Sequence, residues 1–266
     1  MYKRDYAAAI EDFSEAIQID ANNAMAYANR GYAWSVQNSF DKAVSDFTEV
    51  IRLEPNDAYA FEGRGFAWAK IGVFDKSLAD CTETIRLSPS KSSAYVSRGY
   101  AWTMMGEFEN SIDDFTEAIR LDPIDASAYV SRGYSWWKAG NNAAALQDYG
   151  EAIRLNAEDA SAYNNFAWLV STCPIAEFRD GSKGLDYATK ACELSNWETW
   201  YNIGTLAAAY AEIEQWENAV KWQKLAITLA TDEKDKQGGR DRLELYKSRK
   251  PYREQPATVK DIALFK

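Results

Sequence analysis

The sequence predicts an all-α protein built from repeated pairs of antiparallel helices. Shifted by 34 residues, it matches itself over four successive units, which begin at Ala24, Ala58, Ser92 and Ala126. In each unit, apolar residues recur three and four residues apart in two successive segments, which is the spacing of one face of a helix. A short polar residue precedes the first segment of most units and is expected to cap it, namely Asn23, Asp57, Asp125 and Asp159.

Small and large residues alternate where the two helices of a unit are expected to meet. The eighth place of each unit is glycine, which lets two backbones approach, and the eleventh place is tryptophan, which fills the space beyond. These places hold Gly31, Gly65, Gly99 and Gly133, and Trp34, Trp68, Trp102 and Trp136. Each unit is therefore predicted to be a helical hairpin that packs on the next one.

Two less regular units follow the four regular ones. The first has a lengthened connection, from Thr172 to Gly181, before its second helix. An insertion of this kind costs little entropy if it lies on the surface. Because Cys173 lies within this connection, it is expected to be exposed. Cys81, which replaces a core aromatic residue, is expected to be buried. The six predicted unit ranges are 24–57, 58–91, 92–125, 126–159, 160–196 and 197–231.

The two ends of the chain depart from the repeat. Residues 1–23 contain only a second helix, whose partner helix is missing, which leaves open whether the natural chain extends upstream of Met1. Residues 232–250 are expected to form a charged capping helix interrupted at Gly238 and Gly239. Residues 251–266 read as an extended tail, of which three apolar residues could dock: Ile262, Leu264 and Phe265.

The first helix lacks its partner and is expected to expose part of an apolar stripe. Exposed stripes of this size usually meet another surface, so self-association through this edge is a second hypothesis. The stripe consists of Tyr2, Tyr6, Ile10, Phe13 and Ile17.

The composition narrows the classes of function. The 266 residues include 40 acidic and 30 basic side chains, and the net charge of −10 disfavours a nucleic-acid partner. No apolar run approaches the roughly 20 residues needed to cross a bilayer, so no membrane partner is expected and a cytoplasmic location is favoured. Histidine is absent, and the three cysteines match neither a disulfide framework nor a zinc pattern. We therefore expect no cofactor, no metal and no enzymatic activity.

The repeated residues resemble the tetratricopeptide repeat family, from about Tyr6 to Leu229. The resemblance implies a right-handed superhelical solenoid of antiparallel helix pairs, with a groove lined mainly by the first helix of each unit and used to bind peptides or proteins. The stretches 179–181 (Arg-Asp-Gly) and 205–210 (Thr-Leu-Ala-Ala-Ala-Tyr) further resemble bacterial multi-repeat proteins.

Arginine at the seventh place and aspartate at the twenty-third place recur together in four units. Both are lost together in the last two units, where the pairs become Phe166 with Tyr187 and Leu206 with Trp222. Because a partly buried arginine needs a carboxylate, we expect ion pairs, inside each unit or between neighbours, rather than a ligand site. This expected ion-pair ladder consists of Arg30, Arg64, Arg98, Arg132, Asp46, Asp80, Asp114 and Asp148.

The sixth and ninth places of the first helices fall where the family's groove runs. Aromatic side chains with two rotatable bonds make low-entropy contact surfaces, and small polar residues beside them can bond to an extended backbone. The alternative is that neighbouring rings only stack on one another. The candidate groove residues are Tyr32, Phe66, Tyr100, Tyr134 and Trp168, with Asn29, Ser97, Ser131 and Asn165.

One known mode of the family is not expected. Its chaperone-binding members use lysine, asparagine and arginine at the second, fifth, sixth and ninth places of three units, and among those places in the first three full units only Asn29 matches. The sequence therefore favours a scaffold that binds an extended peptide or partner protein in its groove. The alternative is a self-assembly module that oligomerises through its first helix, and an enzyme would require a catalytic domain upstream.

Overall fold

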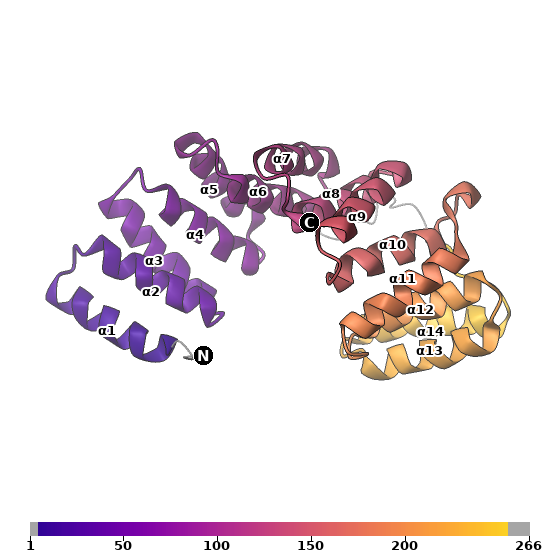
Figure 1. The fold of residues 1–266 in the computed structure, drawn as a ribbon. Coiled ribbons are helices and arrows are strands. Elements are labelled where there is room, and N and C mark those ends of the chain that lie inside the picture. Colours follow the sequence, from indigo (N-terminus) through magenta and orange to yellow (C-terminus); the bar gives the residue numbers. More distant parts are fainter. Residues whose placement is uncertain (1–4, 255–266) are drawn as a thin grey trace. The chain divides into compact units, whose positions relative to one another are not determined.

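The computed structural model describes residues 5–254, which form α-helices joined by short turns and one short 3₁₀ helix (Figure 1). No strand occurs among the described residues. They divide into two compact units, one up to Pro123 and the other from Ile124 onward. The fold is all-α, as the sequence predicts.

The first unit contains seven helices, and each packs on the next along the chain. The first helices of neighbouring repeats also touch, as α2 touches α4 and α4 touches α6. The helices are α1 (Tyr6–Ile19), α2 (Ala24–Val36), α3 (Phe40–Leu53), α4 (Ala58–Lys70), α5 (Phe74–Leu87), α6 (Ser92–Met105) and α7 (Phe108–Leu121).

The second unit contains the remaining helices, which again pack in chain order, with α10 also resting on α12. Its helices are α8 (Ala126–Lys138), α9 (Asn142–Leu155), α10 (Ala160–Thr172), the 3₁₀ helix η1 (Ala176–Phe178), α11 (Gly181–Leu194), α12 (Trp200–Glu212), α13 (Trp216–Leu229) and α14 (Glu233–Lys247).

The polar residues that precede the first helices act as caps. Asp57 Oδ1 accepts from the backbone N–H groups of Tyr59 and Ala60 at 2.8 and 3.2 Å, which satisfies two amides that have no partner inside the helix. Asn23, Asp125 and Asp159 cap their helices in the same way. The expected capping of α2, α4, α8 and α10 by these residues is thus confirmed.

The tryptophans at the eleventh place lie at equivalent points of successive hairpins. The carbonyl of Trp68 accepts from Val73 at 2.9 Å and that of Trp102 accepts from Glu107 at 3.0 Å, so the same hydrogen bond closes the turn into the second helix. Within these turns Gly72 and Gly106 have φ of 79°, a left-handed conformation that suits glycine.

Glycine at the eighth place allows the close approach of the two helices of a hairpin. A Cβ placed on Gly133 would lie 2.7 Å from Cε1 of Tyr149, and one on Gly99 would lie 3.0 Å from Cε1 of Phe115. The rings of Tyr149 and Phe115 are almost fully buried against these glycines. In these two hairpins the core therefore includes one large ring packed on a bare backbone, whereas Gly65 faces the smaller Cys81.

The long connection in the fifth repeat (residues 160–196) is held in place by hydrogen bonds. The prediction that Cys173 within it is exposed is wrong. Cys173 is only 2% exposed because Arg179 hydrogen-bonds both to the connection and to α12. Nη1 of Arg179 donates to the carbonyl of Cys173 at 3.0 Å, and its Nε donates to Glu212 on α12 at 3.0 Å. The backbone N–H of Asp180 also donates to the carbonyl of Val170. Cys81 is buried, as expected.

The capping helix α14 runs without interruption through Gly238 and Gly239, contrary to the sequence prediction. Gly239 is buried where α14 packs on α13, and a Cβ there would lie 2.7 Å from Cγ1 of Ile227. The missing side chain therefore serves close packing and does not break the helix. Residues 251–254 continue as an extended segment, and the tail residues Ile262, Leu264 and Phe265 lie outside the described residues.

The apolar stripe of α1 is only partly open. Ile10 is buried, contrary to expectation, because it lies on the side of α1 that packs on α2. Tyr6, Phe13 and Ile17 are half-buried, and Tyr2 lies outside the described residues. Tyr6 leans on Tyr32 of α2 with ring centroids 6.5 Å apart. The open part of the stripe is therefore narrower than the sequence indicated.

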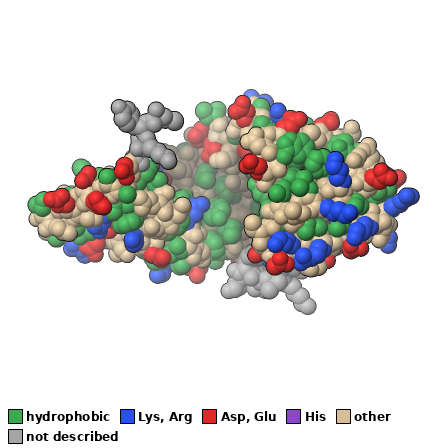
Figure 2. Space-filling model, turned by 90° about the horizontal axis from the view of Figure 1, so that it is seen from below, with side chains coloured by type: hydrophobic (Ala, Val, Ile, Leu, Met, Phe, Trp, Pro, Cys, Tyr) green, Lys and Arg blue, Asp and Glu red, His purple; other side chains and the backbone are tan. Residues whose placement is uncertain are grey.

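The surface mixes charged and apolar side chains. Figure 2 shows acidic, basic and hydrophobic groups interspersed over the visible face. Of the helices from residue 5 to residue 254, none is both long and apolar enough to span a bilayer. Over the same range, no group of three or more metal-ligating side chains converges on one point.

Candidate functional site

The arginines and aspartates of the predicted ladder meet inside each repeat. Nε and Nη2 of every arginine donate to the two carboxylate oxygens of the aspartate sixteen residues later, at 2.7 to 2.9 Å. The sequence left open whether the pairs form inside a 34-residue repeat or between neighbouring repeats. In the structure each pair lies inside one repeat. The pairs are Arg30 with Asp46, Arg64 with Asp80, Arg98 with Asp114, and Arg132 with Asp148.

The ladder also joins neighbouring repeats within the first unit. Nη1 of Arg30 donates to Ser14 Oγ at 3.0 Å, and Nη1 of Arg64 and of Arg98 reaches a threonine hydroxyl of the preceding second helix at 3.2 and 3.3 Å. The hydrogen bonds to aspartate raise the pKa of Arg30 and of Arg98. These guanidinium groups are occupied on two sides by the protein itself, which fits a role in the fold.

Rings and aliphatic groups replace the ladder in the last two repeats. The Phe166 and Tyr187 rings pack edge to face with centroids 5.0 Å apart, and Leu206 is buried in the cluster against which Trp222 packs. The same places are thus filled either by an ion pair or by an apolar contact.

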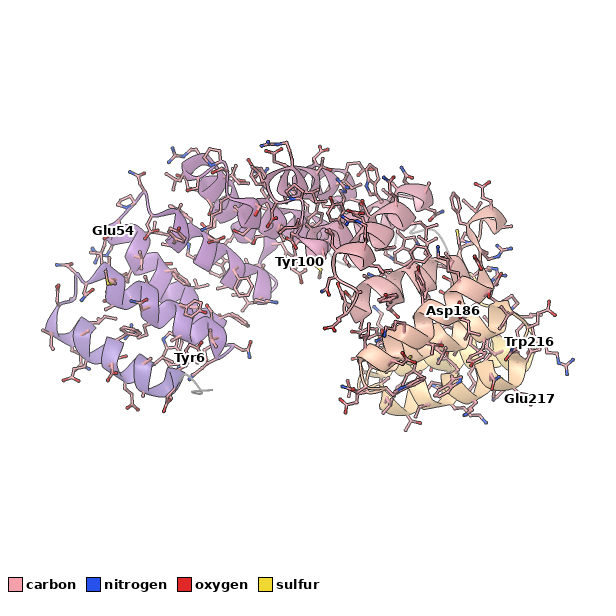
Figure 3. The ribbon with its side chains drawn as sticks, in the orientation of Figure 1. Tyr6, Glu54, Tyr100, Asp186, Trp216 and Glu217 are labelled. Atoms are coloured by element: carbon pink, nitrogen blue, oxygen red, sulfur yellow. The ribbon has the colours of Figure 1, made fainter. Side chains whose placement is uncertain are left out.

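In the first compact unit, which ends at Pro123, the aromatic residues at the ninth place of each repeat are open to solvent. Tyr32 is 55% exposed, Phe66 42% and Tyr100 44%. Within this unit none of the three rings stacks on another, since Tyr32 contacts Tyr6 and Phe66 contacts Phe40. Figure 3 labels Tyr6 on α1 and Tyr100 on α6. Beside them Asn29 is exposed and Ser97 is half-buried, but no described cavity includes these residues.

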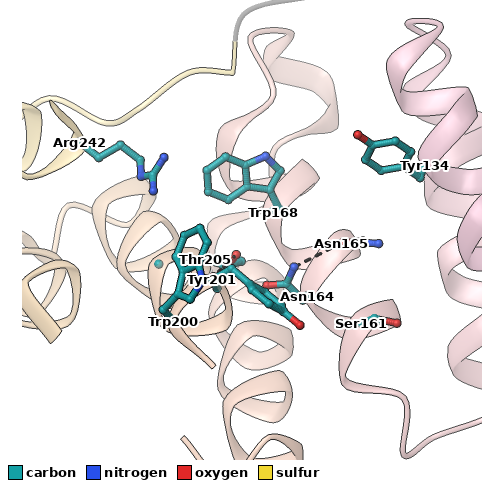
Figure 4. Close-up of a pocket in the computed structure, with 10 residues that line it drawn as sticks. Tyr134, Ser161, Asn164, Asn165, Trp168, Trp200, Tyr201, Thr205 and Arg242 are labelled. Atoms are coloured by element: carbon teal, nitrogen blue, oxygen red, sulfur yellow. Dashed lines mark hydrogen bonds between the residues drawn. The ribbon is translucent and has the colours of Figure 1, made fainter. Parts of the chain in front are cut away.

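A cavity of about 500 Å³ lies within the second unit (Figure 4). Three of the predicted groove residues line it, namely Tyr134, Asn165 and Trp168, whereas Ser131 does not. The cavity joins four helices, because its walls come from α8, α10, α12 and α14. The complete lining is Tyr134, Ser161, Asn164, Asn165, Trp168, Trp200, Tyr201, Gly204, Thr205 and Arg242.

The lining residues follow the repeat. Ser161, Asn164, Asn165 and Trp168 occupy the second, fifth, sixth and ninth places of α10, and the corresponding second, fifth and sixth places of α12 hold Tyr201, Gly204 and Thr205. These are the places that the resemblance assigns to ligand contact. Asn165 and Trp168 are predicted from the sequence, whereas Ser161 and Asn164 occupy second and fifth places, which the prediction considered only in the first three full repeats.

The aromatic walls of the cavity are held by neighbouring rings. Trp168 contacts Tyr252 of the C-terminal segment with centroids 5.7 Å apart, and Trp200 contacts Tyr201 edge to face at 5.7 Å. Burial, followed by the charge of Glu254, raises the pKa of the Tyr134 hydroxyl, which therefore stays neutral. The walls are apolar surfaces with fixed orientation.

The polar groups of the cavity are only partly satisfied. Nδ2 of Asn164 donates to Oδ1 of Asn165 at 3.4 Å, whereas Oδ1 of Asn164 is buried and accepts no hydrogen bond from the described residues. The hydroxyls of Ser161 and Thr205 donate within their own helical turns, to Asp159 and to the carbonyl of Tyr201. An unfilled acceptor in a cavity is a place where a ligand donor gains a bond.

Arg242 closes the cavity from α14. Its guanidinium carbon lies 5.7 Å from the Trp168 ring centroid and 5.8 Å from that of Tyr252, so the side chain rests on two aromatic faces. Arg242 and Trp200 were not predicted from the sequence. Neither belongs to the repeating groove pattern, and a lone arginine in a charged helix carries no signal of its own.

The comparisons with known proteins agree with this fold. The tetratricopeptide repeat family model matches residues 1–58 and 105–165. None of the curated proteins matches the sequence. Among solved structures, the Cut9–Hcn1 hetero-tetramer of the APC/C has 15% identity and a TM-score of 0.69, covering 91% of this chain and 47% of that one.

Two smaller proteins are similar as well. MamA from Desulfovibrio magneticus RS-1 has 20% identity and a TM-score of 0.56, covering 59% of this chain and 89% of that one. YrrB has 18% identity and a TM-score of 0.55, covering 73% and 97%. At these identities the similarity shows the fold alone. The 34-residue repeat and the helical hairpins agree with the family model, which identifies tetratricopeptide repeats in residues 1–58 and 105–165.

Proposed function

We propose that the chain is a protein-interaction scaffold that binds an extended segment of a partner protein in the cavity of its second unit. The observation that carries this proposal is the lining of that cavity by the same places of two successive first helices. Aromatic walls of fixed orientation supply contact area at low entropic cost, and the amide side chains of Asn164 and Asn165 supply hydrogen bonds to a backbone.

Two further observations support binding over catalysis. The residues that line the cavity include neither a general base nor a pair of carboxylates, and the carboxylate bonded to the hydroxyl of Ser161, that of Asp159, caps the start of α10. The structurally similar YrrB is described as a protein with an unusual peptide-binding site. The kind of ligand proposed here is therefore one that this fold is able to hold.

The proposal is tested by selecting peptides from a random display library on the full chain. A selected peptide should bind the wild type and lose about tenfold or more in affinity to a Tyr201→Ala, Asn165→Ala double variant, because aromatic anchors dominate such contacts. Tyr201 is 49% exposed, so its loss should leave the fold intact. Fluorescence anisotropy measures the affinity and circular dichroism checks the helix content.

Leu225→Ala is the matched control, because Leu225 is an exposed apolar residue of α13 in the same unit and lies outside the cavity. It should bind the selected peptide as the wild type does. Failure to select any peptide, or equal binding by the double variant, would show that the cavity is not the binding site.

Self-assembly through α1 is the alternative function and stays a prediction. Ile19 is 82% exposed, and Tyr6, Phe13 and Ile17 are half-buried, which leaves some apolar surface at this edge. Light scattering over a range of concentrations measures the mass directly. A strict monomer at high concentration would exclude this alternative.

A further inference from the structure

Arg242 differs from the arginines of the ladder in having no carboxylate. Each ladder arginine donates two hydrogen bonds to an aspartate, whereas Arg242 makes neither an ion pair nor a hydrogen bond with any residue between 5 and 254. Its Nε is nevertheless buried. A buried donor on a charged group that has no acceptor costs free energy, so the site is incomplete by itself.

The cavity around Arg242 has an excess of positive charge. Its ten lining residues include no aspartate and no glutamate. A carboxylate close to the walls, that of Glu254, already accepts from the Tyr252 hydroxyl at 3.1 Å and lies 4.0 Å from Nζ of Lys138. The guanidinium therefore faces a space that suits an anion, in a protein whose net charge is −10.

We propose that the cavity recognises an acidic side chain, aspartate or glutamate, within an extended segment of the partner protein. Arg242 pairs with the carboxylate of the ligand, and the free Oδ1 of Asn164 accepts a backbone N–H from the same segment. This inference rests on the proposed function and adds the chemistry of the ligand to it. Guanidinium is suited to the pairing because its planar donors match a carboxylate.

The position of the lining residues favours an internal residue of the partner over its chain terminus. Tyr134, Trp168 and Tyr201 belong to three successive first helices, so the lining extends across repeats. A segment that passes through such a lining makes contacts on both sides of the acidic residue. Trp168 and Tyr252 hold the guanidinium from its apolar side, which orients its donors before the ligand arrives.

The test uses a library of random peptides displayed as internal segments, without a free carboxyl terminus. Selection on the full wild-type chain should enrich one aspartate or glutamate at a fixed position. Changing that residue of the peptide to its amide should weaken binding to the wild type by about tenfold or more. The same change should have little effect on binding to Arg242→Gln, because the partner of the carboxylate is already gone.

Two variants control for charge and shape. Arg240→Gln removes one positive charge from the same helix, at a side chain that pairs with Glu233 outside the cavity, and should bind as the wild type does. Arg242→Lys should retain part of the acid preference. Binding to the wild type should also weaken with added salt more than binding to Arg242→Gln.

Several outcomes would overturn the inference without touching the proposed function. Selected peptides that depend on Tyr201 but show no acidic position would refute the acid preference. An acid preference that persists in Arg242→Gln would refute the role of Arg242. A parallel library with free carboxyl termini, if it alone yields peptides that bind, would assign the site to a terminal carboxylate instead. The proposed function itself fails only if no selected peptide depends on the cavity.

Discussion

Replacing Asp114 by asparagine tests how much the ion pair between Arg98 and Asp114 contributes to the stability of the fold. The change keeps the size of the side chain and removes its charge. In the wild type, Arg98 donates to Asp114 through Nε at 2.9 Å and through Nη2 at 2.7 Å, with a third bond to Thr82. Asparagine offers only one acceptor, so the guanidinium keeps its charge and loses its counter-charge.

The size of the effect follows from burial. The side chain of Asp114 is 7% exposed and that of Arg98 is 23% exposed. Removing one partner of a buried ion pair costs about 3–5 kcal/mol, because the other charge stays buried. Arg98 retains some access to water and one acceptor, so we expect about 2–3 kcal/mol of lost stability. The variant breaks one of the two hydrogen bonds that raise the pKa of Arg98 and removes the negative charge from the other.

Urea unfolding followed by circular dichroism measures the loss, and hydrogen exchange in α6 and α7 shows where it acts. Glu117→Gln is the control, because Glu117 pairs with Arg120 on the exposed face of the same helix, where an ion pair contributes little. An Arg98→Met, Asp114→Leu double variant should recover part of the loss, since apolar pairs can replace buried ion pairs. Equal unfolding curves for Asp114→Asn and Glu117→Gln would refute the reasoning.

Two further predictions concern packing and thiol chemistry. Gly133→Ala should lower the free energy of unfolding by about 1–3 kcal/mol, because its Cβ would meet a buried ring, whereas Gly150→Ala, with nothing within 4 Å, should raise it by about 0.5–1 kcal/mol in urea titrations. Burial raises the pKa of Cys81 and Cys192 to about 12, so these thiols stay protonated and should react with Ellman's reagent only on unfolding. Because the unfolded thiols ionise near pH 9, stability should fall as the pH rises from about 9 to about 12. Rapid labelling of native protein, or two glycine variants of equal stability, would contradict these expectations.

The parts of the fold that repeat could be predicted from the sequence. Three features recur at the same place of each regular repeat: a helix cap such as Asp57, a glycine such as Gly99, and an ion pair such as Arg98 with Asp114. Each repeat therefore gives a further indication of the same contact. The joint loss of the arginine and the aspartate in the last repeats indicated that the two places are paired, and in the structure Phe166 and Tyr187 at these places are in contact. Local chemistry and periodicity are enough for such features.

The features that the sequence did not reveal depend on contacts between distant segments. Cys173 is buried because Arg179 reaches Glu212, thirty-three residues further along the chain. Glu212 also pairs with Arg253, and the backbone N–H of Glu254 donates to the carbonyl of Thr172, so the C-terminal segment closes over α10. No periodic signal encodes these pairings, since each occurs once.

The same reason explains why only part of the cavity could be foreseen. Trp168 and Asn165 stand at repeat places and were predicted, but the surface becomes a cavity only when α14 adds Arg242 and the C-terminal segment adds Tyr252 behind Trp168. A capping helix must cover the last apolar face, and that requirement alone does not say which of its side chains turns back toward the groove.

The ladder arginines of the same chain can be compared with Arg242 to judge what its charge does. Where the ladder aspartates are absent, the ladder arginines are absent too, and Phe166 and Leu206 occupy their places. Packing in this fold is thus satisfied without an arginine whenever no carboxylate is at hand. Arg242 lies against two rings with no carboxylate among the described residues, a position where an uncharged side chain would also pack. In the unliganded protein its charge is therefore offset only by these two rings, and a carboxylate supplied by a partner is the compensation that the geometry of the cavity allows.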